Sequence, residues 1–363
     1  MASPPLALAQ SPPHCWSELP LDLMQLIFER LSFTDFERAK SVCSSWLSGS
    51  RRSKPNNKIP WMILFPEEKN YCLLFNPEDK KEKLYKTQHL GDDLADSFCL
   101  ATCRSWLLMY TFREVPFYIL NLLTLERINL PISYVSDSPI LWIDERSKDY
   151  LVISDDLVYF KKGDNSWKKI SEELSDFHEG MVFKDHKLYC LTDDVLGVFD
   201  FSGEFPVKVY RVNVGGCVKP ETRGQINMHD PWEFHHLRRR NNVVVTLGGD
   251  VLIVRSKSPA MSYSWNFRIF KLDSSNGKTK WEEMVSLGDE AILLDLGITV
   301  LAKDQEGLTS NSIYFTGDEL NFYRTEIFVF NLDTKKVEQL PPLVSSSVSF
   351  SRARWFLPSF RND

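Results

Sequence analysis

Apolar residues recur at every third or fourth position near the start of the chain, and this spacing predicts short amphipathic helices. The Leu19-Pro20 pair marks the start of the first helix, because a proline there removes only an N–H that has no helical partner. Asp22 adds a negative charge in the first turn, which suits the helix dipole. The apolar stripe consists of Leu19, Leu23, Ile27 and Leu31, and it is widened by Leu26 and Phe28.

Two further helices are expected before the first long polar stretch. Thr34 and Glu37 have the spacing of a capping box, which predicts that the second helix begins at Phe36. Ser44 is a candidate cap for a third helix, which carries Trp46. A unit of under about 40 residues rarely folds alone without a disulfide, a metal or a partner. The apolar surface of these helices therefore predicts a docking module that a second protein covers.

From residue 59 onward the pattern changes to short β-rich runs separated by turn residues. A strand–turn–strand theme recurs, with steps of 45, 40, 39, 71 and 60 residues between equivalent positions. Steps of about 40 to 50 residues in a β-rich chain are typical of propeller blades, and the longer steps would contain insertions. The pattern predicts a propeller, with six blades favoured over five or seven, and a pair of β-sandwiches is the alternative. The equivalent positions are Asn76, Asn121, Lys161, Asp200, Lys271 and Asn331.

Three short motifs occur together in the helical segment: L-P-x-D-L at residues 19–23, I-x-x-x-L at 27–31 and V-C-x-x-W at 42–46. With this spacing, ahead of a β-rich region, the segment resembles the F-box. The resemblance implies a three-helix module that docks on the Skp-type adaptor of a cullin–RING ubiquitin ligase. The alternative is an ordinary helical hairpin whose apolar stripe is its own core. Carried over by position, the adaptor-facing residues would be Leu19, Pro20, Leu23, Ile27, Leu31 and Trp46.

The β-rich region resembles the C-terminal domain of unknown function that many plant F-box proteins carry. This likeness implies a kelch-like propeller, although kelch repeats have a Gly-Gly pair in each blade and this region has only Gly215-Gly216 and Gly248-Gly249. No Trp-Asp dipeptide occurs, which excludes a WD40 array. The segments that carry the resemblance are Ser105–Pro131, Val243–Ser256 and Phe267–Asp295, the last followed by Asn311–Glu319.

Composition limits the class of protein and its surroundings. A length of 363 residues with 43% hydrophobic residues allows a small module and one large packed domain, an α+β multidomain fold. A net charge of −6 provides no general attraction for nucleic acid. No apolar run reaches the roughly 18 residues that a membrane span needs. The first residues contain no Lys or Arg, whereas secretory and mitochondrial targeting signals carry positive charge near their start. Seven scattered cysteines fit a reducing compartment, so we expect a soluble, intracellular protein of the nucleus, the cytoplasm or both.

The expected domains are a disordered leader at 1–14, the F-box-like helical module at 15–50, a linker at 51–58 and a propeller-like domain at 59–363. In the last of these, the polar and aromatic stretch NMHDPWEFHHLRRRNN at 227–242 predicts a long loop on one propeller face, where binding residues often lie. Its histidines lack the spacing of a metal site, so a solvated loop is favoured over metal binding. The weak candidates for target binding are Trp232, His235, His236, Arg238, Arg239 and Arg240.

No pattern in the chain indicates a catalytic centre. Cys99 and Cys103 are expected on one face of a strand, about 13 Å apart, which is too far for one zinc ion and favours two buried thiols. The acidic pairs at 92–93, 155–156 and 193–194 fall at expected turns, which aspartate favours. Most tryptophans lie in strand-like runs and are expected to fill the space between blades. We therefore expect no catalytic residue, no metal and no cofactor.

The leading hypothesis is a substrate-recognition subunit of an SCF-type ubiquitin ligase, a non-catalytic protein whose propeller binds an unknown target. Its partners would be the Skp-type adaptor and, through it, the cullin–RING ligase, with neither membrane nor nucleic acid. A different class is a β-propeller domain that binds glycans or hydrolyses a substrate and has no link to ubiquitin. A third possibility is an F-box protein that binds the adaptor and never joins a cullin.

Overall fold

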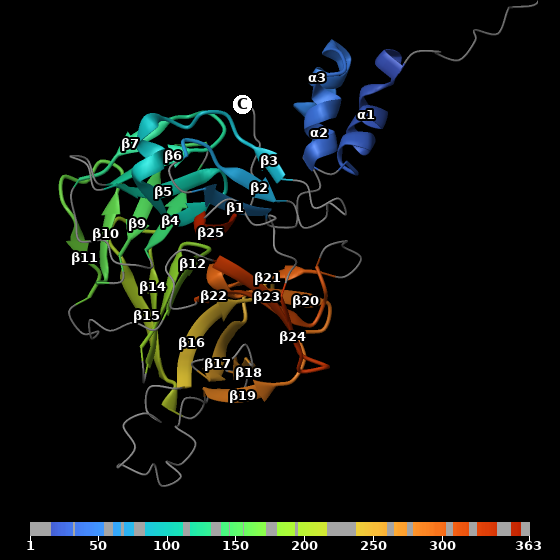
Figure 1. The fold of residues 1–363 in the computed structure, drawn as a ribbon. Helices are drawn as coiled ribbons and strands as arrows, with labels where there is room; N and C mark the ends of the chain where they lie inside the picture. Colours follow the sequence, from blue (N-terminus) through green and yellow to red (C-terminus); the bar gives the residue numbers. More distant parts are fainter. Residues whose placement is uncertain are drawn as a thin grey trace, which may run out of the picture. The chain divides into compact units, whose positions relative to one another are not determined.

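The computed structural model describes residues 16–31, 33–53, 61–66, 69–75, 84–111, 117–131, 139–144, 146–154, 156–171, 180–192, 195–215, 237–259, 265–273, 279–302, 308–318, 325–339 and 350–356. The chain divides into two compact units, one of Met1–Lys58 with Pro358–Asp363 and one of Ile59–Leu357. The first contains the α-helices and the second contains the β-strands (Figure 1). None of the described helices is long and apolar enough to cross a membrane.

The described part of the helical unit has a short 3-10 helix, η1 (Trp16–Glu18), and three α-helices, α1 (Leu21–Phe28), α2 (Phe33–Lys40) and α3 (Ser44–Ser50). Two predicted starts were wrong. Helix α2 begins at Phe33 instead of Phe36, which brings Asp35 into the first turn, where its charge suits the helix dipole. The N-cap of helix α3 is Cys43 instead of Ser44. The backbone of Cys43 is still extended, as at an N-cap, whereas Ser44 is already the first helical residue.

The described strands of the second unit form four sheets of four strands each, in the orders β25–β1–β2–β3, β4–β5–β6–β7, β8–β9–β10–β11 and β12–β13–β14–β15, and one larger sheet. The first contains β25 (Phe350–Phe356), β1 (Trp61–Pro66), β2 (Leu73–Phe75) and β3 (Leu84–Lys86), and the second β4 (Ser97–Cys103), β5 (Trp106–Thr111), β6 (Phe117–Asn121) and β7 (Arg127–Asn129). The third contains β8 (Ile140–Ile143), β9 (Tyr150–Ile153), β10 (Val158–Lys161) and β11 (Lys168–Lys169). The fourth contains β12 (Gly180–Lys184), β13 (Lys187–Leu191), β14 (Val195–Asp200) and β15 (Val207–Asn213).

The fifth sheet has nine strands in the order β19–β18–β17–β16–β21–β20–β22–β23–β24. Its first strands are β16 (Leu237–Val245), β17 (Val251–Pro259), β18 (Asn266–Asp273) and β19 (Lys280–Met284). The others are β20 (Glu290–Leu293), β21 (Ile298–Leu301), β22 (Ser312–Asp318), β23 (Thr325–Asn331) and β24 (Val337–Gln339). Two 3-10 helices, η2 (Asp92–Asp96) and η3 (Leu294–Leu296), complete the unit. Within the fifth sheet, the group β16–β19 and the group β20–β24 meet where β16 and β21 pair in parallel through Val245 and Ile298.

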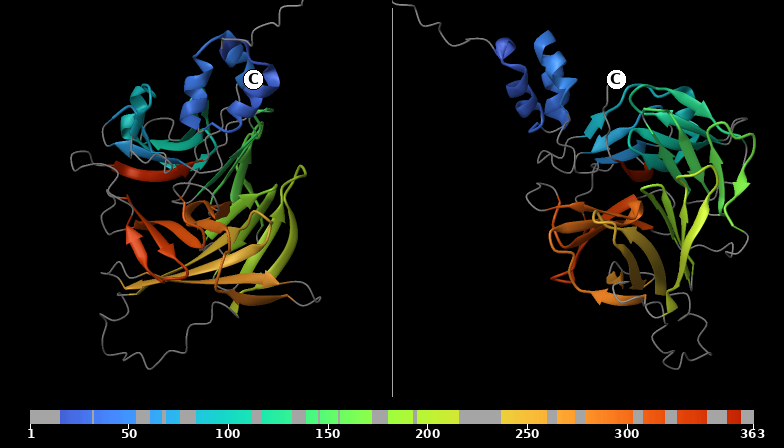
Figure 2. Two further views of the ribbon diagram at one scale, coloured as in Figure 1. Left: turned by 90° about the vertical axis from the view of Figure 1, so that its right-hand side faces the viewer. Right: turned by 180° about the vertical axis from the view of Figure 1, so that it is seen from behind.

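The sheets follow one another around a common centre and pack face to face (Figure 2). One cluster joins the second and third sheets through Trp106 and Leu141, and another joins the third and fourth through Tyr159 and Leu188. The ring closes through the first sheet, where β25 from the end of the chain pairs antiparallel with β1. Thr102 of the second sheet also donates from Oγ1 to the β25 backbone, at 2.7 Å. This arrangement is a β-propeller.

The recurring theme predicted from the sequence corresponds to the third strand of a sheet and the turn that follows it. Asn121, Lys161, Asp200 and Asn331 are the last residues of β6, β10, β14 and β23. The prediction is thus confirmed at four positions. Lys271 lies two residues before the end of β18, so this equivalence was displaced, and Asn76 lies outside the described residues.

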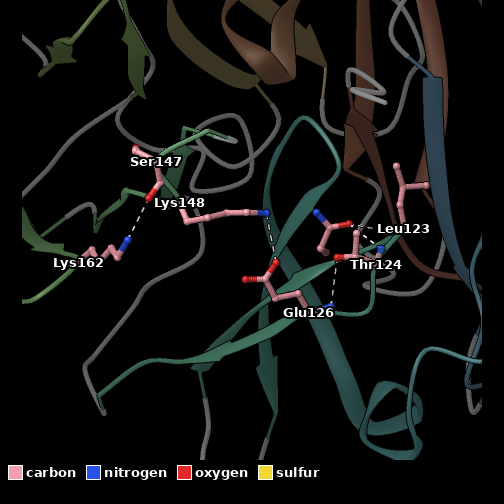
Figure 3. Close-up of polar contacts among 7 residues, drawn as sticks. Leu123, Thr124, Glu126, Ser147, Lys148 and Lys162 are labelled. Carbon is pink, nitrogen blue, oxygen red and sulfur yellow. Dashed lines mark hydrogen bonds and ion pairs between the residues drawn. The ribbon is translucent and has the colours of Figure 1, made fainter. Parts of the chain in front are cut away.

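Two of these turns have the same construction. The Asn121 side-chain oxygen accepts the backbone N–H groups of Leu123 and Thr124 at 2.9 and 3.0 Å. Asn331 accepts those of the two corresponding residues in the last turn at 3.0 and 2.9 Å. Figure 3 shows the first turn and its link to the third sheet, where Lys148 Nζ donates to Glu126 Oε2 at 3.2 Å. Asparagine therefore ends the third strand by satisfying backbone donors of the turn.

Candidate functional site

The helical unit has a small core of its own around Phe28. This side chain is fully buried, and its ring makes edge-to-face contacts with Phe36 at 4.9 Å and with Trp46 at 5.6 Å between centroids. Met24 and Ala39 are buried beside it. Aromatic pairs in this geometry contribute beyond the area that they bury. The three helices therefore already use one apolar face on each other.

Helix α3 is held by two close contacts, one with α1 and one with η1. At Gly49 a Cβ atom would lie 3.2 Å from the Met24 Cβ, which is tight, so glycine allows α3 to approach α1 closely. The Trp46 indole Nε1 donates to the backbone oxygen of Trp16 at 2.9 Å, which ties η1 to α3. These contacts fix α3 against both α1 and η1.

The opposite side of α1 remains apolar and exposed. Leu23 is 48% exposed and Leu26 is 51% exposed, and residues three apart are neighbours on a helix surface. Ile27, four residues after Leu23, is half-buried. We call Leu23, Leu26 and Ile27 the α1 outer face. Since large apolar side chains that are left exposed together indicate a docking surface, this face is the candidate partner site.

The six residues predicted to face an adaptor divide into two groups. Leu23 and Ile27 belong to the α1 outer face, and Pro20 is exposed at the N-cap of α1. The other three residues, Leu19, Leu31 and Trp46, are partly buried against the core around Phe28. The six predicted residues do not include Leu26, which widens the apolar stripe. Nor do they include Trp16 and Val42, which are exposed apolar residues outside that stripe.

The predicted target-binding stretch of the propeller is described only in part. Trp232, His235 and His236 lie outside the described residues. The three arginines were predicted in a loop, and this was wrong: Arg238, Arg239 and Arg240 belong to β16 and pair with Ser258, Lys257 and Ser256 of β17. The valines that follow them start a long antiparallel hairpin, and backbone pairing extends it back through the arginines.

The cysteine prediction was partly wrong. A β-bulge between Cys99 and Ala101 shifts the register, so the alternation of faces breaks and Cys99 and Cys103 no longer share one face. Cys99 is buried, whereas Cys103 is half-buried. Burial raises the pKa of the Cys190 thiol to about 12 and that of Cys72 well above its ordinary value, so both thiols stay protonated and unreactive. Within the described ranges, no three His, Cys, Asp or Glu side chains are grouped to hold a metal ion.

A small helical unit with an open apolar face, followed by a propeller, defines the class of F-box proteins with a C-terminal β-propeller. The chain matches the F-box domain over residues 16–58 and the KIB1-4 beta-propeller over residues 74–331. It belongs to the family of F-box proteins that carry the KIB1-4 β-propeller.

Relatives from Arabidopsis thaliana are similar over the full length. F-box protein At1g69090 is 55% identical, with 100% of each chain covered. A second relative, At5g66830, which is named as a candidate F-box protein, is 51% identical over 100% of this chain and 99% of its own. Both units of the chain are thus shared with these relatives.

Proposed function

We propose that this protein is the substrate-recognition subunit of an SCF-type cullin–RING ubiquitin ligase. The helical unit docks on a Skp-type adaptor, and the propeller holds a target protein. The observation that carries the proposal is the α1 outer face, which stays apolar and exposed although the helices already have a core. The F-box match over residues 16–58 supports it. Such a ligase works inside the cell, in the nucleus, the cytoplasm or both.

The chain itself makes or breaks no covalent bond in this role. A substrate receptor raises the effective concentration of a ubiquitin-charged carrier near a target lysine, so the rate gain comes from proximity. The chain then needs one surface that binds the adaptor, a second surface that binds the target, and a stable connection between the two. This role needs neither a metal nor an organic cofactor.

We further propose that the propeller has six blades. The nine-stranded sheet divides into two groups of strands at the single pair of Val245 and Ile298. The two groups also share one buried cluster, in which the Phe267 ring of the first group lies 5.0 Å, between centroids, from the rings of both Phe315 and Phe330 of the second. Neighbouring blades of a propeller pack in this way, whereas neighbouring strands of one flat sheet do not.

The decisive experiment is Leu23→Asp in the full-length chain, tested by pull-down with purified Skp-type adaptor. A charge at a position that is buried on docking should abolish capture, because the carboxylate would lose its hydration without a partner. Val285→Asp is the matched control, since Val285 is an exposed apolar residue of the propeller unit. It should leave capture unchanged.

Adaptor capture by Leu23→Asp at the wild-type level would contradict the proposal. Circular dichroism and thermal unfolding of the same variant verify that the helices remain, as expected for a surface substitution. A complex that captures adaptor but fails to assemble with a cullin in reconstitution would limit the role to adaptor binding.

A further inference from the structure

We draw no further inference here: the strongest candidate, the exposed apolar surface that Phe205, Val207 and Val209 form at the edge strand β15, carries none because nothing in the described part of the structure shows what covers it.

Discussion

The ion pair between Arg268 and Glu283 links neighbouring strands β18 and β19 by two hydrogen bonds. Arg268 Nε and Nη2 donate to the two carboxylate oxygens at 2.8 and 2.6 Å. These hydrogen bonds hold the pKa of the Glu283 carboxyl below its ordinary value. A carboxyl with a lower pKa in the folded state stabilises the fold above the unfolded pKa, and this contribution is lost as pH falls through the folded pKa.

We therefore expect Glu283→Gln to lower the free energy of unfolding at neutral pH, by less than about 1 kcal/mol because both side chains are well exposed. Their exposed fractions are 44% and 43%. In acid, below the folded pKa, the difference from wild type should disappear. Urea unfolding at several pH values measures this. A difference that persists in acid would show that the substitution acts through packing instead.

At the residue scale, the sequence predicted that α1 is amphipathic but did not predict which side faces the unit's own core. Apolar residues occur almost all around α1, so the spacing of Leu23 and Ile27 was as regular as that of Met24 and Phe28. The core selects Met24 and Phe28 because Phe36 and Trp46 lie on that side. Which side of α1 is buried thus depends on residues of α2 and α3, so the sequence of α1 by itself does not determine it.

At the scale of elements, the asparagines that end β6 and β23 should be equivalent in energy as well as in geometry. We expect Asn121→Ala and Asn331→Ala each to lower the free energy of unfolding of the propeller by about 1 to 2 kcal/mol, since each leaves two turn N–H groups without their acceptor. Chemical denaturation followed by tryptophan fluorescence measures both.

Leu123→Ala is the control in the same turn, because Leu123 contributes a backbone N–H to Asn121 and its exposed side chain is not needed for that contact. This substitution should lower the free energy of unfolding much less than Asn121→Ala does. A loss equal to that of Asn121→Ala would assign the effect to general disturbance of the turn.

The turns were also the part of the propeller that the sequence predicted best. The strand ends at Asn121, Asp200 and Asn331 have a local chemical signature, because short polar side chains bond to turn backbones. In the turn after Lys161 this role belongs to Asp164, which accepts the Lys161 backbone N–H at 3.0 Å. The bulge after Cys99 and the extension of β16 through the arginines were not predicted. Both depend on which strand lies alongside, and that information is not local.

At the scale of the whole propeller, ring closure depends on β25, whose partner β1 lies almost the full length of the domain away in the sequence. Trp355 is buried on β25, opposite Met62 of β1. Its ring is edge-to-face with Tyr314, at 6.3 Å between centroids. One side chain thus joins the first sheet to the fifth. Pairing at such sequence separation leaves no periodic signal, so the closure could not be predicted from the sequence.

Trp355→Ala should therefore destabilise the propeller by about 3 to 5 kcal/mol, the usual cost of truncating a large buried aromatic residue. Trp355→Phe should lower the stability much less, because an aromatic ring is kept and, among the described residues, no group accepts the indole N–H. Adaptor capture by the helical unit should survive both changes, since the two units have separate cores. Thermal unfolding together with adaptor pull-down measures both effects. Loss of adaptor capture in Trp355→Ala would mean that the helical unit folds only on an intact propeller, against the independence that its own core around Phe28 implies.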